Sequence, residues 1–168
     1  VGERAFYECD NLERFNFGNS ATYIGGYAFY GCEKLASLTG TGKIEKIYSN
    51  AFLNCENLTS ATKFSSVYQI SSFAFKNCKK LKRVEFGDAL KTIPEGLFYS
   101  NESLTDVKIG KGVKTIGTEA FMHCKALKNI YMPEGLETIE PRALYDTKIE
   151  EFLIPSTVTK INGDICLA

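Results

Sequence analysis

The stretch from Ile116 to Ile139 reads IGTEAFMHCKALKNIYMPEGLETI and spans one full period of a pattern that repeats every 23 residues. Within it, a phenylalanine follows a small apolar residue and is followed by cysteine after three residues and by leucine after six. The phenylalanine recurs at Phe6, Phe29, Phe52, Phe75, Phe98 and Phe121, and Leu144 takes the next place. Self-similarity of this length is the signature of a solenoid.

Further columns keep the same spacing. The residue before each of these positions forms its own column: Ala5, Ala28, Ala51, Ala74, Leu97, Ala120 and Ala143. The cysteine column is Cys9, Cys32, Cys55, Cys78, Asn101, Cys124 and Thr147. The leucine column is Leu12, Leu35, Leu58, Leu81, Leu104 and Leu127. An isoleucine column runs Val1, Ile24, Ile47, Ile70, Ile93, Ile116 and Ile139.

The seventh repeat is one residue short after Thr147, and the columns then resume. The residues that restore them are Ile149, Phe152, Ile154, Val158 and Ile161. We therefore expect residues 1–168 to form a single solenoid of about seven repeats, truncated at both ends and without visible capping units.

The periodicity inside a unit changes between two patterns. Ala5, Cys9 and Leu12 follow the spacing of about two helical turns, whereas Val84 and Phe86 alternate as in a strand. One 23-residue unit cannot bury a core alone, so the units must stack. The sequence predicts an α/β repeat solenoid with short parallel strands on its concave side. Gly40 and Lys63 replace strand core residues, which predicts two less regular coils.

Composition excludes several classes of protein. The 20 Lys and Arg residues balance the 20 Asp and Glu residues, so no net charge indicates a nucleic-acid partner. No apolar run approaches the roughly 20 residues of a membrane span. The first residues lack the pattern of a signal peptide. No motif for a cofactor or a catalytic centre is present.

The residues with reactive side chains have structural explanations. Five cysteines share one column and have no Cys-x-x-Cys pair, so we expect reduced, buried thiols and no metal. His123 next to Cys124 is not expected to form a catalytic pair, because neighbours in sequence seldom converge. The segment Thr39 to Lys43 resembles part of a phosphate loop, but Ile44 stands where Ser or Thr is required.

The repeat resembles that of the BspA-like leucine-rich repeat proteins, a bacterial and protozoan surface family. The segments IGTEAFMHCKAL from Ile116 and LKNIYMPEGLET from Leu127 carry the resemblance, which extends over the chain. The resemblance implies a curved, right-handed solenoid and a secreted or cell-surface location. It also implies adhesion to host extracellular proteins such as fibronectin or fibrinogen. It identifies the partner poorly, because repeat residues define the scaffold only.

The candidate binding residues lie between the core columns of the strand segment. These positions vary in sequence and are small and polar in the first coils, but charged or aromatic in later ones. Aromatic and arginine side chains are common anchors of interfaces. We hypothesise that a protein partner binds the concave face around Arg83, Glu85, Asp106, Lys108 and Tyr131.

Three functions remain open on the sequence. The first is a non-catalytic protein-binding module, the second is a spacer whose surface binds nothing, and the third is an accessory region of a larger protein. Five basic residues between Lys76 and Arg83 and the acidic residues Glu134 to Glu151 indicate either a solvated surface or charge complementarity to an extended partner.

Overall fold

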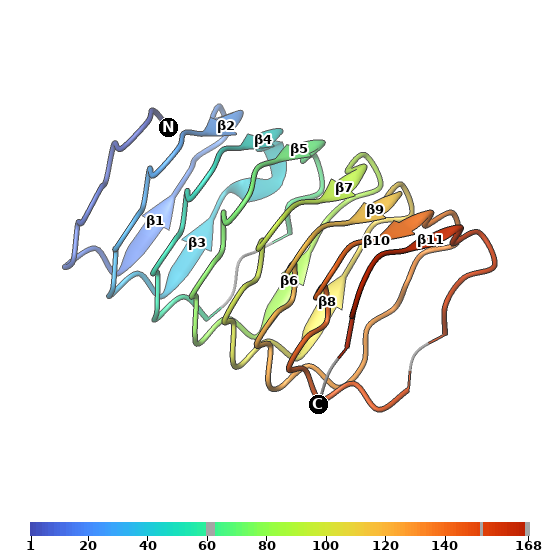
Figure 1. Cartoon of the computed structure of the whole chain (residues 1–168). Coiled ribbons are helices and arrows are strands. Elements are labelled where there is room, and N and C mark those ends of the chain that lie inside the picture. Colours follow the sequence, from blue (N-terminus) through green and yellow to red (C-terminus); the bar gives the residue numbers. More distant parts are fainter. Residues whose placement is uncertain (60–62, 152, 167–168) are drawn as a thin grey trace.

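The computed structural model describes residues 1–59, 63–151 and 153–166, and these form a stack of coils with parallel strands (Figure 1). Each regular coil has three sides: a strand of a first sheet, a strand of a second sheet, and a series of turns. The first-sheet strands are β1 (Arg14–Asn16), β3 (Ser37–Thr39), β6 (Arg83–Glu85) and β8 (Asp106–Lys108). The second-sheet strands are β2 (Tyr23–Ile24), β4 (Lys46–Ile47), β5 (Gln69–Ile70), β7 (Thr92–Ile93), β9 (Thr115–Ile116), β10 (Thr138–Ile139) and β11 (Lys160–Ile161).

The strand register reproduces the sequence period. Arg14 pairs with Ser37 and Arg83 pairs with Asp106, each 23 residues apart. In the last pair of strands Ile139 lies opposite Ile161, only 22 residues on, as the shortened seventh repeat requires. The predicted parallel-strand solenoid with 23-residue units is therefore confirmed.

The phenylalanine column forms the centre of the core. Rings in neighbouring coils are stacked with centroids 5.0–5.9 Å apart from Phe6 to Phe121, within the usual range for aromatic pairs. From Phe29 onward the rings are fully buried. One continuous apolar cluster runs through the described coils, so no coil has a separate core.

The cysteine column adds a second regular feature to the core. Each buried thiol donates to the carbonyl of the column phenylalanine one coil earlier, at 3.0–3.2 Å, as from Cys55 to Phe29. The described cysteines form no disulfide. The expectation that Cys9 is buried is wrong: it is exposed, because the described coils adjoin it on one side only.

The side expected to be helical consists of successive tight turns instead. Ala28 and Cys32 bond to carbonyls three residues back, while Phe29 between them donates to Ala51 of the next coil at 2.8 Å. Bonds between coils thus alternate with bonds inside the turn, which an α-helix cannot accommodate. In each coil two residues four apart adopt φ of 52–69°, a conformation that interrupts any helix. The only helix among the described residues is the short 3₁₀ segment η1 (Thr41–Lys43).

The two coils predicted to be less regular depart from the repeat at Gly40 and at Lys63. Gly40 has φ of 72° and leads into η1 in place of a continuing strand. One coil later Lys63 is exposed and Phe64 is buried in its stead, bridged to Phe86. Phe64 thus supplies the apolar side chain that position 63 lacks, one residue out of step.

The second sheet is divided between β5 and β7. In the other coils the residue after the column isoleucine donates its N–H to the isoleucine of the preceding coil, as Ser71 does to Ile47 at 2.9 Å. Pro94 occupies this position after β7 and has no N–H, so Ile70 receives no such bond. No helix of the described ranges is long and apolar enough to cross a membrane.

Candidate protein-binding face

We define the strand face as the outward side of the first sheet together with residues 128–132 and 153–156 of the coils that follow it. Strand alternation places the predicted residues here: Arg83 and Glu85 flank the buried Val84, and Asp106 and Lys108 flank Val107. Two residues assigned to this face by the sequence, Ser60 and Thr62, lie outside the described residues.

The four predicted charged residues pair with one another across neighbouring strands. Arg83 Nε lies 2.7 Å from Asp106 Oδ2, and Lys108 Nζ lies 2.9 Å from Glu85 Oε1. Lys63 Nζ also approaches Glu85, at 3.6 Å. The sequence predicted the residues of this set but not their mutual pairing, which follows from the 23-residue register.

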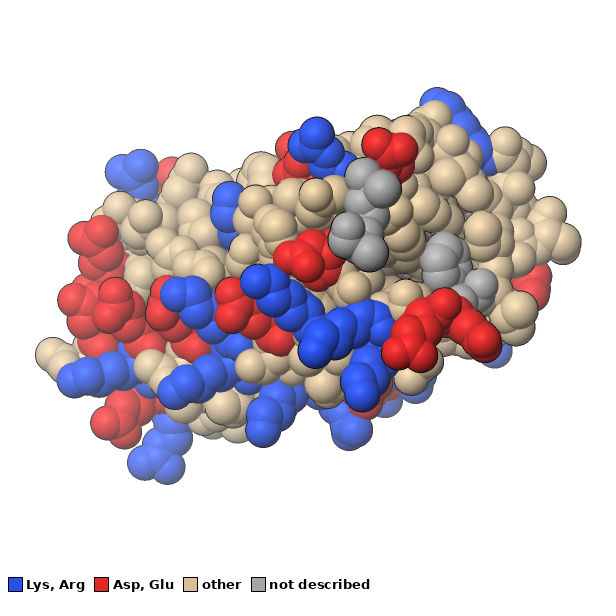
Figure 2. Space-filling view, turned by 60° about the horizontal axis from the view of Figure 1, so that its bottom comes forward, with Lys and Arg blue, Asp and Glu red and all other residues tan. Residues whose placement is uncertain are grey.

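We call Arg83, Glu85, Asp106 and Lys108 the charge lattice. Each of these four side chains has an oppositely charged partner in the free protein. The hydrogen bond from Lys108 lowers the pKa of Glu85, and the same bond raises the pKa of Lys108. Both side chains are solvated, and exposed pairs of this kind contribute little to stability. A partner would therefore have to match the pattern of alternating charges and not a single sign. Figure 2 shows Lys and Arg interleaved with Asp and Glu along one side of the molecule.

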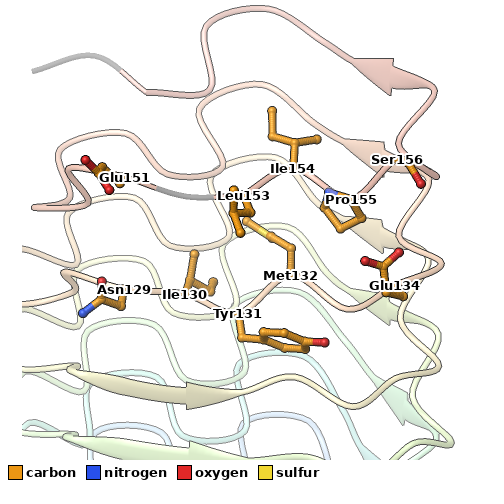
Figure 3. Close-up of a pocket in the computed structure, with 10 residues that line it drawn as sticks. All are labelled: Asn129, Ile130, Tyr131, Met132, Glu134, Glu151, Leu153, Ile154, Pro155 and Ser156. Carbon is orange, nitrogen blue, oxygen red and sulfur yellow. The ribbon is translucent and has the colours of Figure 1, made fainter.

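Tyr131 lies beyond the charge lattice, beside a hollow of about 620 Å³ on the strand face (Figure 3). Two neighbouring chain segments line it: Asn129, Ile130, Tyr131, Met132, Glu134, Glu151, Leu153, Ile154, Pro155 and Ser156. Tyr131 is 67% exposed and Leu153 is 91% exposed, the two largest values among the exposed large apolar residues. An exposed apolar patch with a polar rim is typical of interaction sites.

The hollow arises where the first sheet ends. Among the described residues the sheet's last strand is β8, and residues 129–132 and 153–155 of the following coils are not in strands. Ile130 and Met132 keep their inward positions and are buried. Leu153 comes after the one-residue shortening of the seventh repeat, and the described residues leave it exposed. The apolar surface thus accumulates where the repeat loses its regularity.

The side chains of His123 and Cys124 have separate partners in the structure. No group of three or more His, Cys, Asp or Glu among the described residues could hold a metal ion. His123 Nδ1 contacts Asp146 Oδ2 at 2.7 Å and sits edge-on between Tyr99 and Tyr145. The thiol of Cys124 instead donates to the Phe98 carbonyl, so histidine and cysteine do not converge.

Comparison with known proteins agrees with the repeat pattern. A family model for the BspA type leucine rich repeat region matches residues 1–64 and 45–166, in six copies. Among solved structures, a leucine rich cell surface protein from Faecalibacterium prausnitzii superposes with a TM-score of 0.72 and 27% identity, over 96% of this chain and 38% of that one.

Two further structures show the same likeness. A leucine-rich repeat protein from Bacteroides ovatus has a TM-score of 0.57 and 26% identity, over 96% of this chain and 54% of that one. The pneumococcal vaccine antigen PcpA has a TM-score of 0.53 and 26% identity, over 96% and 49% respectively. The chain therefore spans about two fifths to one half of the length of these proteins. No curated protein matches it significantly.

Proposed function

Because this chain belongs to the BspA-type leucine-rich repeat family, we propose that it is a non-catalytic protein-binding module of a secreted or cell-surface protein. The proposed role is adhesion to host extracellular proteins, with fibronectin and fibrinogen as the first candidates. The location is supported by the likeness to a structure described as a cell surface protein.

The proposed binding surface is the strand face from β6 to the seventh coil. Its centre is the hollow beside Tyr131, where Tyr131 and Leu153 expose apolar area that a partner could remove from water. At about 25 cal/mol per Å² of apolar area, such burial is the main favourable contribution that this face offers. This exposed apolar hollow is the single observation that carries the proposal.

The charge lattice of Arg83, Glu85, Asp106 and Lys108 would border this centre and select the partner. Each charge already has an opposite neighbour, so binding must replace or extend those pairs and gains little net free energy from them. The lattice would therefore act in orientation and specificity. The same pairing favours the second candidate function, a spacer whose solvated surface binds nothing.

Binding of the purified fragment to immobilised fibronectin and fibrinogen, measured by biolayer interferometry, tests the proposal. The variant Tyr131→Ala/Leu153→Ser should weaken binding at least about tenfold, as expected for hot-spot truncations. The control is Tyr68→Ala, which removes a tyrosine that is 45% exposed outside the strand face. Equal affinity of the double variant and the control would exclude this surface, and binding to neither protein would favour the spacer.

A further inference from the structure

A second hollow lies on the other sheet, at its junction with the turns near β2 and β4. It measures about 420 Å³, and its lining is Glu3, Tyr23, Gly25, Gly26, Tyr27, Tyr48 and Ser49. Three of the seven lining residues are tyrosines and one is an acid, and none is a lysine or an arginine. This composition differs from that of the strand face, where both signs of charge alternate.

Glycine creates the space between these side chains. Glu3, Gly26 and Ser49 occupy equivalent positions in three successive coils, so the missing side chain of Gly26 leaves a gap between an acid and a hydroxyl. A Cβ at Gly26 would meet only the Ser49 carbonyl oxygen, at 3.5 Å, so the backbone there is open to the gap. Gly25 is different: a Cβ there would lie 2.5 Å from Glu3 N, because the preceding coil packs against it.

Tyrosine rings form the walls. Tyr23 and Tyr48 stand edge to face, with centroids 6.4 Å apart and an interplanar angle of 86°. Two perpendicular ring planes beside a carboxylate create a concave region of negative potential, because the face of an aromatic ring is its negative side. Among the described residues, none of the ion pairs uses the Glu3 carboxylate, so its charge is available to a ligand.

Rings of the same part of the molecule already attract cations. The Arg4 guanidinium lies 5.6 Å from the Tyr27 ring centroid, and Lys46 Nζ lies 5.6 Å from that of Tyr68. Both distances are within the range of cation–π interactions. Arg4 therefore already occupies the Tyr27 ring, whereas among the described residues no cation lies over the rings of Tyr23 and Tyr48, which remain open to an external ligand.

We propose that the hollow between Glu3, Tyr23 and Tyr48 binds an organic cation that carries a methylated ammonium group. A methylated ammonium is weakly hydrated and bulky, so it gains from ring faces without a large loss of hydration, and aromatic cages are the usual sites for it. The Glu3 carboxylate supplies the opposite charge at the rim. The site does not depend on the strand face or on the protein partner proposed above.

Titration of the whole fragment with tetramethylammonium, followed by the NMR signals of the tyrosine rings, tests this site. We expect saturable shifts that are largest at Tyr23 and Tyr48. The neutral isostere tert-butanol at equal concentration should cause no saturable shift, because it has the same shape but no charge. Saturation by tert-butanol at the same concentrations would overturn the assignment to a cation.

Three variants locate the site. Gly26→Leu fills the gap and should reduce affinity at least about tenfold, whereas Glu3→Gln should reduce it about threefold, as expected for one partly solvated charge. If Gly26→Leu does not fold, Tyr48→Ala takes its place: it removes one ring of the hollow and should likewise reduce affinity. Tyr68→Ala is the control outside the hollow and should bind as the wild type does. Unchanged affinity in Gly26→Leu and Tyr48→Ala, or no saturable shift in the wild type, would overturn the proposal.

Discussion

Asn101 occupies a position that is cysteine in the other five of the first six coils, and its replacement by cysteine should stabilise the protein. Its side chain is fully buried, and its Oδ1 accepts the Cys78 N–H at 2.8 Å. Its Nδ2 has no hydrogen-bond partner among the described residues. A buried donor without a partner loses its hydration and gains nothing in return.

The neighbouring coils show what cysteine would restore. The Phe52 carbonyl accepts the Cys55 N–H at 3.1 Å and the Cys78 thiol at 3.2 Å. In the next coil the Cys78 N–H donates to Asn101 Oδ1 and not to the Phe75 carbonyl. Within the described part of the chain, the Phe75 carbonyl therefore accepts neither a backbone N–H nor a thiol at this position.

The magnitude follows from these bonds. An unsatisfied buried polar group costs about 1–3 kcal/mol, and Asn101→Cys removes it. The lost Oδ1 bond is replaced by the bonds to Phe75, each worth about 0.5–1.5 kcal/mol, so these contributions largely cancel. The free energy of unfolding should rise by about 1–3 kcal/mol, and Tm by about 2–4 °C for each kcal/mol in a chain of this size.

Urea denaturation followed by circular dichroism would measure the change. The reverse variant, Cys124→Asn, places the same amide one coil later and should lower the free energy of unfolding by a similar amount. If Asn101→Cys is no more stable than the wild type, or Cys124→Asn is neutral, then the unpaired amide is not a source of instability and the reasoning fails.

Four further outcomes are expected. Phe75→Ala should lower the free energy of unfolding by about 3–5 kcal/mol in urea denaturation, because the ring is fully buried between two stacked neighbours; a loss below about 1 kcal/mol would contradict the stacked core. Gly110→Ala should abolish folding, since a Cβ there would lie 2.1 Å from the Gly87 carbonyl oxygen, whereas Gly42→Ala has open space and should leave Tm unchanged. Burial raises the pKa of Cys32 to about 11, so the free energy of unfolding should fall as pH rises from about 9 towards 11, and Cys32→Ala should reduce that slope in denaturation series. In the native protein at pH 8, a thiol reagent should modify only the two exposed cysteines, Cys9 and Cys166.

The sequence alone determined the repeat, its length and the residues of its core. Equivalent residues of stacked coils meet the same neighbours, so each core column must repeat, and the phenylalanines from Phe29 to Phe121 are buried as predicted. The sequence also predicted the one-residue deletion after Thr147 and the irregular coils at Gly40 and Lys63, because at each of these points a column of equivalent residues is interrupted. The family resemblance rested on the same columns, and the family model confirms it.

Only the tertiary structure decided how each coil turns and which surface residues meet. The spacing of Ala5, Cys9 and Leu12 fits a helix as well as a series of turns, and the hydrogen bonds between coils favour the turns. The pairing of Arg83 with Asp106 and the gap above Gly26 depend on neighbours 23 residues away. Surface positions vary from repeat to repeat without a period. The contacts between their side chains are therefore known only once the coils are stacked.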